Sequence, residues 1–362
     1  MTDFGFTDDQ LALAATVRDV LREHCPPAAL RTGRRPAWDR LAGLGFFGLL
    51  LPAEDDGLGL TLTDILPALE ETGRACLPGP VVETAVAAPF LVPGTPKLAS
   101  GVVSVSVLLP GQTYAPDADL ADLLVVARAD GPRLVARESV RLVPKPGADP
   151  CRPLFAVAFD DSEPLDVRVA PALRRATVAT AAQLIGVARE LLAVSVTYAK
   201  ARTQFGAAIG SFQAVKHRLA DVAVAVEFAA PLVWRAALAV DGSAAAAGRA
   251  DSAVDGSAVT AGRAALTVDG PAVTAGRAAS VGGPARTVER DVSAAKAAAG
   301  EAAVLAARAA LQVHGAIGYT EELDLRFWLA RAWSLSAAYG TTAVHRERLR
   351  TAISGGDLRR YP

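Results

Sequence analysis

Residues 201–221 read ARTQFGAAIGSFQAVKHRLAD, and this stretch separates two segments that have the apolar periodicity of long helices. It gathers a cation, two amide side chains and two phenylalanines around glycines, although a helix connection needs only the turn. The glycines account for that turn, but Arg202, Phe205 and Gln213 need another explanation. We interpret the stretch as a candidate binding site between two helices.

The chain after residue 176 has apolar side chains at helical spacing almost to its end, which predicts a bundle of four antiparallel helices. In the first helix, Leu184, Val187 and Leu191 fall on one stripe. We expect the bundle to form a C-terminal domain over 171–362, with its later helices at 215–240, 292–315 and 323–340.

Residues 1–95 are expected to form a helical N-terminal domain. Thr7 and Gln10 have the spacing of a capping box, in which each side chain reaches the backbone of the other residue. Thr63 or Asp64 is expected to cap a later helix in the same domain.

Residues 96–170 are expected to form a small middle β domain, because the apolar period changes to two. Val103, Val105 and Val107 alternate with small residues, and apolar runs on both sides of Asp130-Gly131 predict a hairpin. The fold class is therefore mainly α with a small β domain.

One segment of the predicted bundle is repetitive. Three copies of a fourteen-residue unit begin at Val240, Val254 and Val268. They are rich in glycine and alanine and lack the large apolar face that could bury a core. We interpret 240–285 as a mobile insertion between the second and third bundle helices, with a short helical hairpin as the alternative.

The composition excludes several classes of protein. The chain has 362 residues and a formal charge of −1 without a sustained basic run, which argues against a nucleic-acid binder. Its three cysteines lie far apart, and its histidines lack ligand spacing, so neither a disulfide framework nor a metal site is expected. With no uninterrupted apolar window of membrane length and no signal peptide, we predict a cytoplasmic protein without a membrane span.

Several motifs together resemble the acyl-CoA dehydrogenase family of flavoproteins. LAGLGFFGLLLPAEDDGLGL and LEETGRACLPGP are similar to its N-terminal domain, and the segment that contains RTQFG is similar to its most recognisable signature. QVHGAIGYTEELDLRFWLARA resembles a later segment, which in the family contains Gln-x-x-Gly-Gly. The resemblance implies a helical domain, a β-barrel-like domain and a four-helix bundle.

The resemblance implies FAD as cofactor and assigns the opening stretch to it. Arg202 offers a planar, permanently charged fork for phosphate oxygens, Phe205 an apolar surface for a ring, and Gln213 an amide that donates and accepts. The family's matching residues reach across a subunit interface to the adenine and pyrophosphate half of a neighbour's FAD. The later segment contributes Gln312, Gly315 and Ala316, and Ala316 replaces the family's second glycine.

Two family features are missing from the sequence. The β domain contains neither the Thr-Glu-Pro nor the Gly-Ser-Asp segment that holds the flavin ring. The family usually places its catalytic glutamate just before a Gly-Thr pair, but here Tyr339 precedes Gly340 and Thr341. A tyrosine is almost wholly protonated at neutral pH and is a poor base. Thr341 keeps a position from which it is expected to touch FAD.

Other carboxylates do not replace the missing base. Some relatives carry the glutamate on the first bundle helix, but the matching position here is about Ala176. Glu190 and Glu301 are expected on solvated helix faces, and Glu321 and Glu322 follow a turn, where carboxylates favour a helix N-terminus. We assign no catalytic residue in this chain.

The sequence therefore keeps the half-site that serves a neighbour and lacks the half-site that would serve the chain itself. This asymmetry favours a non-catalytic subunit of an α2β2 acyl-CoA dehydrogenase, in which a catalytic partner subunit holds the FAD. The resemblance implies an acyl-CoA substrate, electron-transfer flavoprotein as electron acceptor, and a place in steroid degradation. The alternatives are a self-sufficient homo-oligomeric dehydrogenase with an unrecognised base and a flavin-free scaffold protein on the same fold.

Overall fold

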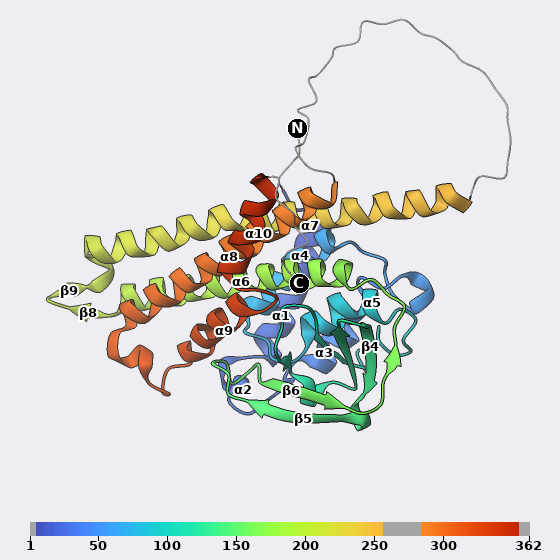
Figure 1. Ribbon diagram of the computed structural model, residues 1–362. Coiled ribbons are helices and arrows are strands. Elements are labelled where there is room, and N and C mark those ends of the chain that lie inside the picture. Colours follow the sequence, from blue (N-terminus) through green and yellow to red (C-terminus); the bar gives the residue numbers. More distant parts are fainter. Residues whose placement is uncertain (1–4, 256–283, 355–362) are drawn as a thin grey trace, which may run out of the picture.

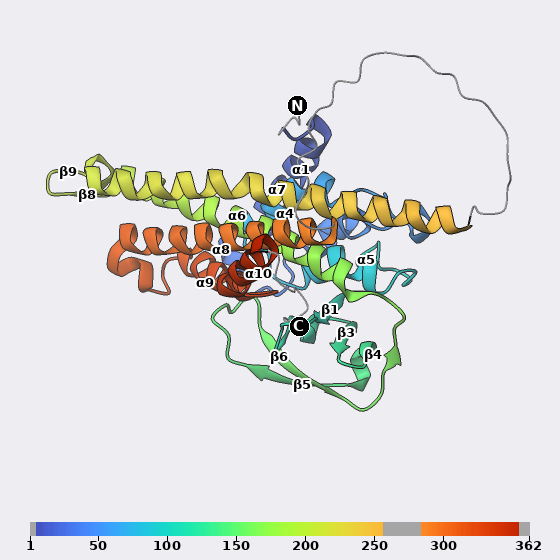
Figure 2. The same ribbon diagram turned by 45° about the horizontal axis from the view of Figure 1, so that its top comes forward.

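The computed structural model describes residues 5–255 and 284–354 and shows a mainly helical protein with a small β region. Long helices lie side by side across the molecule, short N-terminal helices pack against them, and the strands form a separate layer on one side (Figures 1 and 2). The predicted fold class is confirmed. One large apolar core runs through the helices and reaches strands β1 and β3, and a smaller cluster lies among the strands.

The N-terminal helices begin and end at local signals. Thr7 caps the first helix with the predicted capping box, in which its side chain accepts from the Gln10 backbone. A later helix is capped by Thr61 with Asp64 as its reciprocal partner, so the prediction of Thr63 or Asp64 as the cap was wrong by two or three residues. The helices are α1 (Asp8–His24), α2 (Pro27–Leu30), α3 (Trp38–Gly43), α4 (Leu62–Arg74) and α5 (Ala88–Leu91), with a π-helical turn at Glu83–Ala87 before α5.

The β region contains two sheets. In the first, strand order is β1-β3-β4-β7, with β1 parallel to β3 and the remaining pairs antiparallel. The predicted hairpin is present, since Arg128 pairs with Gly131 across the turn. The second sheet has the order β2-β6-β5. The strands are β1 (Val105–Leu108), β2 (Ala115–Pro116), β3 (Leu123–Arg128), β4 (Gly131–Ala136), β5 (Val140–Lys145), β6 (Leu154–Phe159) and β7 (Glu163–Pro164).

The C-terminal helices form the bundle. Its central helix, α6, is buried over most of its first six turns, where alanines and β-branched residues allow close packing on the neighbouring helices. A two-stranded hairpin, β8 (Thr203–Gln204) and β9 (Ala207–Ala208), joins α6 to α7. The helices are α6 (Val169–Ala201), α7 (Gln213–Asp255), α8 (Pro284–His314), α9 (Leu325–Ala337) and α10 (Thr342–Ser354).

The fourteen-residue repeats lie partly within the described residues. Helix α7 continues to Asp255 and therefore contains the whole copy that begins at Val240. That copy is regular helix, whereas the sequence predicted the start of an insertion there. The copies that begin at Val254 and Val268 lie almost entirely outside the described residues.

Helices α4 and α6 touch through a pair of glycines. A Cβ added at Gly73 would lie 2.0 Å from the carbonyl oxygen of Gln183, and one added at Gly186 would lie 1.9 Å from that of Glu70. The backbones are therefore too close for any side chain at these two positions. This contact fixes the N-terminal helices against the bundle.

Two helices are long and apolar enough to cross a membrane by length and composition alone, α6 and the Gln213–Ala244 part of α7. The apolar window of α6 is 72% buried inside the fold, as in the core helix of a soluble protein, and that of α7 is 39% buried. Helix α7 therefore exposes apolar surface that the described part of the chain does not cover.

Candidate active site

The stretch that opened the sequence analysis forms the β8–β9 hairpin at one end of the bundle. Arg202 caps α6, and its side chain is exposed and pairs with no carboxylate among the described residues. Phe205 and Gly206 form the turn, both with positive φ (52° and 78°). Phe205 is 94% exposed. The hairpin thus presents a cation and an aromatic ring to solvent.

The other predicted cofactor residues on the bundle lie at the same end. Gln213 is the first residue of α7, and Gln312, Gly315 and Ala316 belong to the end of α8 and the turn after it. Tyr198 on α6 stacks on His314 of α8 with ring centroids 4.3 Å apart, which brings the two helix ends together. Figures 1 and 2 both show the hairpin at the end of the bundle where α8 ends.

Thr341 does not join this group. Its hydroxyl accepts from the Val344 backbone at the start of α10, beside the middle of α8, where Lys296 contacts the carbonyl oxygen of Gly340. Lys296 and Gln312 are sixteen residues apart on α8, which is roughly 24 Å along a helix. The structure therefore separates Thr341 from the exposed group at the bundle end.

Tyr339 lies in a strained turn between α9 and α10. Tyr339 and Gly340 both have positive φ, 55° and 114°. Lys296 Nζ donates to the carbonyl oxygens of Ser336 and Gly340 at 3.0 and 3.2 Å. A ring nitrogen of His345 lies 3.2 Å from the Tyr339 carbonyl oxygen. These contacts hold the turn in a conformation that few non-glycine residues adopt.

The side chain of Tyr339 points into the protein and meets a carboxylate. Its hydroxyl donates to Glu83 Oε1 at 2.8 Å, and Arg152 Nη2 lies 3.6 Å from the same oxygen. All three residues are buried. Burial, together with the nearby negative charge of Glu83, raises the pKa of Tyr339 well above its ordinary value. This phenol is a hydrogen-bond donor and cannot act as a base at neutral pH.

Two further groups close to this cluster have strongly shifted pKa values. Burial lowers the pKa of Lys296 to about 7, with a contribution from the positive charge of Arg152. Burial also raises the pKa of Asp117 to about 7. The nearest cation to Asp117 in the described part of the chain is Arg34, whose Nη2 lies 3.5 Å from Oδ1, too far for a good hydrogen bond. Burial therefore outweighs the nearby arginines, Arg152 first among them, in setting the pKa of Asp117.

A cavity of about 390 Å³ lies between the β region and α9. The loop after β1, Gly111–Tyr114, forms one wall, and Trp333 on α9 is part of another. Tyr339 and Arg152 also line the cavity. The volume is in the range of small-ligand pockets. The lining includes Asp149, but its carboxylate accepts from Arg331 in a fully buried ion pair. The cavity therefore offers a ring-sized space, and the described residues that line it include no unpaired carboxylate.

Sequence reasoning missed the buried ionisable residues. Glu83 stands alone in the apolar run VVETAVAA, and Lys296 stands alone among alanines. A single charge inside an apolar pattern is the signal that could have identified them, because a buried charge needs a specific partner. Arg152 carried no comparable signal.

The four carboxylates considered from the sequence lie elsewhere. Glu190 is half-buried between α1, α4 and α6, and burial raises its pKa, so its predicted place on a solvated face was wrong. Glu301 pairs with Arg346 on the surface at 2.6 Å, and Glu321 and Glu322 are exposed. Ala176 is fully buried on α6. None of them lines the cavity beside Tyr339.

Comparison with known proteins shows what this arrangement is similar to. The family model for the acyl-CoA dehydrogenase N-terminal domain matches residues 7–100, and that for the C-terminal domain matches 169–267 and 264–354. Acyl-CoA dehydrogenase IpdE2 from Mycobacterium tuberculosis is 32% identical over 243 residues, which cover 62% of this chain and 74% of that protein.

Solved structures share the fold. A glutaryl-coenzyme A dehydrogenase in complex with glutaryl-CoA superposes with a TM-score of 0.77 at 20% identity, over 99% of this chain and 98% of the other. The ChsE4-ChsE5 complex from Mycobacterium tuberculosis has a TM-score of 0.75 at 18% identity, over 98% of this chain and all of the matched one. At these identities the likeness establishes the fold.

Proposed function

Because the chain belongs to the acyl-CoA dehydrogenase family, whose cofactor is FAD, we propose that it is the non-catalytic subunit of a hetero-oligomeric enzyme. In this assembly it grips the adenine and pyrophosphate half of an FAD whose flavin ring is held by a catalytic subunit. The substrate is an acyl-CoA thioester, and electron-transfer flavoprotein takes the electrons. The observation that carries the proposal is the buried Tyr339–Glu83 hydrogen bond, which occupies both side chains and leaves no free base at this turn among the described residues.

The exposed bundle end fits the outer half of FAD. The Arg202 guanidinium is free to form paired hydrogen bonds with pyrophosphate oxygens, and Phe205 offers its ring face to adenine. A Cβ built at Gly206 or Gly315 would meet no atom within 4 Å, so the space above both backbones is open. Gln312 is exposed beside this space and can donate to or accept from the cofactor.

When bound, FAD supplies the hydride acceptor, and the reaction also needs a base for the α-proton. At the Tyr339 turn, the side chain that enters the interior cluster is a phenol with a raised pKa, which already donates its proton to Glu83. The Arg152 guanidinium beside it favours the ionised form of Glu83 but cannot accept a proton. Proton abstraction is therefore assigned to the partner subunit.

The outer face of α7 supports a partner that covers it. Val224, Phe228 and Leu232 form an exposed stripe at helical spacing, with Phe228 75% exposed. The same helix begins at Gln213, one of the residues assigned to the cofactor. One partner subunit can therefore bury the stripe and place its FAD against the bundle end. The ChsE4-ChsE5 complex, a related fold built from two different chains, is consistent with such an assembly. A cytoplasmic location and a role in steroid degradation belong to the same proposal.

A second candidate is a self-sufficient homo-oligomeric dehydrogenase. It is favoured by the cavity of about 390 Å³ beside Tyr339, which is large enough for a ring system, and by the buried Glu83 carboxylate behind the tyrosine. For Glu83 to act as base, Tyr339 would have to leave its turn.

Flavin content separates the candidates. The chain is purified alone and after coexpression with the acyl-CoA dehydrogenase that co-purifies with it from its host, and the visible absorbance of oxidised flavin is compared. We expect a colourless chain alone and a yellow complex with one flavin for each pair of different chains. A yellow chain alone that is bleached by an acyl-CoA would establish the second candidate, and absence of flavin from both preparations would leave only a scaffold.

A further inference from the structure

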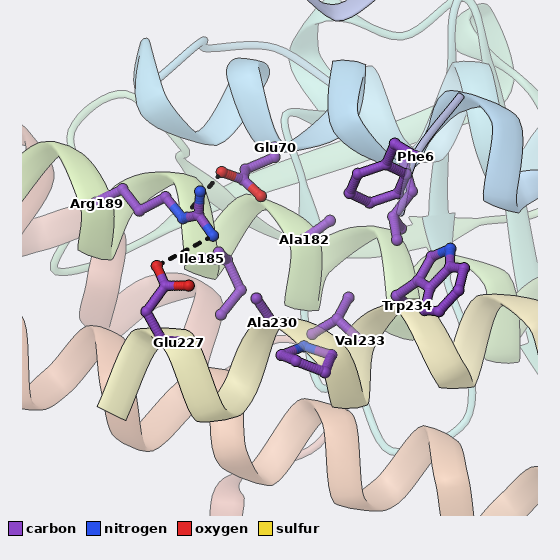
Figure 3. A pocket seen from close by; sticks show the side chains of 11 residues that line it. Phe6, Glu70, Ala182, Ile185, Arg189, Glu227, Ala230, Val233 and Trp234 are labelled. Atoms are coloured by element: carbon purple, nitrogen blue, oxygen red, sulfur yellow. Dashed lines mark ion pairs between the residues drawn. The ribbon is translucent and has the colours of Figure 1, made fainter. Parts of the chain in front are cut away.

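A second cavity lies between the helices of the N-terminal part and the bundle, apart from the site described above. It has a volume of about 180 Å³, is lined by residues of α4, α6 and α7 together with Phe6, and shares no lining residue with the cavity beside Tyr339 (Figure 3). An apolar cavity of about 150 Å³ is enough to hold benzene. This cavity can therefore take a molecule of that size or slightly larger.

The two ends of the cavity differ in chemistry. At one end the rings of Phe6 and Trp234 meet edge to face, with centroids 6.2 Å apart. At the other end Arg189 lies between two carboxylates, 3.3 Å from Glu70 and 3.5 Å from Glu227 (Figure 3). Apolar side chains of the three helices form the walls between these ends.

At the polar end, one buried N–H group has no hydrogen-bond acceptor among the described residues. Arg189 Nε is buried and lies 3.3 Å from Glu70 Oε1 in an ion pair, but it donates no hydrogen bond within the described part of the chain. Glu70 is mostly buried, whereas Glu227 is exposed to water. The groups at this end that face the interior are therefore the Arg189 cation and the Glu70 anion. A half-buried, nearly neutral ion pair with a buried N–H that makes no hydrogen bond favours a neutral ligand atom that accepts one.

We infer that this cavity is a binding site for a small neutral molecule with an apolar, benzene-sized body and a hydroxyl group. The hydroxyl accepts from Arg189 Nε–H and donates to Glu70, while the body packs between the walls and reaches Phe6 and Trp234. An ammonium ion would lie against Arg189, and a carboxylate against Glu70, so both are disfavoured. Ligands with so few atoms bind in roughly the millimolar to micromolar range.

The probes are benzyl alcohol, toluene, benzylamine and benzoate, titrated into the full chain by calorimetry or ligand-observed NMR. Benzyl alcohol is expected to bind about tenfold more tightly than toluene, because only the alcohol fills the hydrogen bond to a charged group. Benzylamine and benzoate are expected to bind more weakly than the alcohol. Equal binding of toluene and the alcohol, tighter binding of either charged probe, or no binding at all would overturn the inference.

Two variants test the named residues. Arg189→Lys keeps the positive charge but removes Nε, so it is expected to abolish the preference for the alcohol over toluene. Ala230→Leu fills the cavity from α7 and is expected to abolish binding of both probes. Arg141→Lys, on the surface of β5, is the matched control and should bind as the unsubstituted chain does. A preference that survives Arg189→Lys would contradict the assignment, and circular dichroism verifies that each variant is folded.

Discussion

Tyr339 and Glu83 are joined by a buried hydrogen bond of 2.8 Å that links the turn after α9 to the π-helical turn before α5. The residues are 256 positions apart in the chain. The bond uses the phenolic proton, and Glu83 is not among the residues that line the neighbouring cavity. Both side chains are buried, so this turn is part of the core and offers solvent no ionisable group.

Removing that hydrogen bond should destabilise the protein. Tyr339→Phe leaves Glu83 buried without its donor, and we expect the free energy of unfolding to fall by about 1–3 kcal/mol. Urea denaturation followed by circular dichroism measures the change. Tyr114→Phe, at a partly exposed tyrosine, should change stability by less than about 0.5 kcal/mol. Equal effects of the two substitutions would show that the Glu83 contact contributes nothing.

Arg202 should control cofactor retention. We expect Arg202→Ala to weaken FAD binding by the hetero-oligomer by about 10- to 100-fold, because a charge-assisted pair of hydrogen bonds to phosphate is lost. Flavin released on gel filtration, measured against protein concentration, reports the loss. Arg141→Ala removes another exposed arginine, from the β region, and serves as control. Full flavin occupancy in the Arg202 variant is the result that would refute the clamp.

The glycine contact between α4 and α6 should tolerate no side chain. Gly73→Ala or Gly186→Ala places a methyl group about 2 Å from backbone atoms, so we expect at least 1–3 kcal/mol of destabilisation. Gly242→Ala on α7 is a matched control, because a Cβ there meets no atom within 4 Å. That control should stabilise the chain slightly through helix propensity. Thermal unfolding of the three variants tests the contrast, which fails if all of them behave alike.

The stability contributed by Lys296 should depend on pH. Its folded-state pKa of about 7 lies below the ordinary lysine value of 10.5, so between these values the unfolded chain binds more protons. Stability from this group therefore rises as pH increases from about 7 to 10, by up to about 1.4 kcal/mol per pH unit. We expect Lys296→Met to lose this rise and Lys200→Met, at an exposed lysine, to retain it. Denaturant midpoints at several pH values measure both, and parallel pH profiles would contradict the prediction.

The fold was predictable because its signals are local. Apolar periodicity predicted the long helices, the spacing of Thr7 and Gln10 predicted the first helix cap, and Asp130-Gly131 predicted the β3–β4 hairpin. The cap of α4 was misplaced, because Thr61, Thr63 and Asp64 all have capping side chains and only the path of the backbone selects among them. The exposed cofactor residues were named from resemblance, and their cofactor role stays a prediction.

The interior of the candidate site was not predictable in the same way. Glu83, Arg152 and Tyr339 come from three distant parts of the chain and meet only after the helices and the β region have packed. Periodicity assigned Glu190 to a solvated face, but α1 and α4 cover it. Such contacts depend on tertiary structure, and a single sequence carries little trace of them.

The copy of the fourteen-residue unit within α7 has a geometric consequence. Fourteen residues of α-helix complete four turns to within about 40° and rise about 21 Å. Duplicating or deleting a unit within a helix would change how far the helix reaches while nearly preserving the direction in which its side chains point. The length of α7 can thus vary in fixed steps during evolution without disturbing the stripe formed by Val224, Phe228 and Leu232.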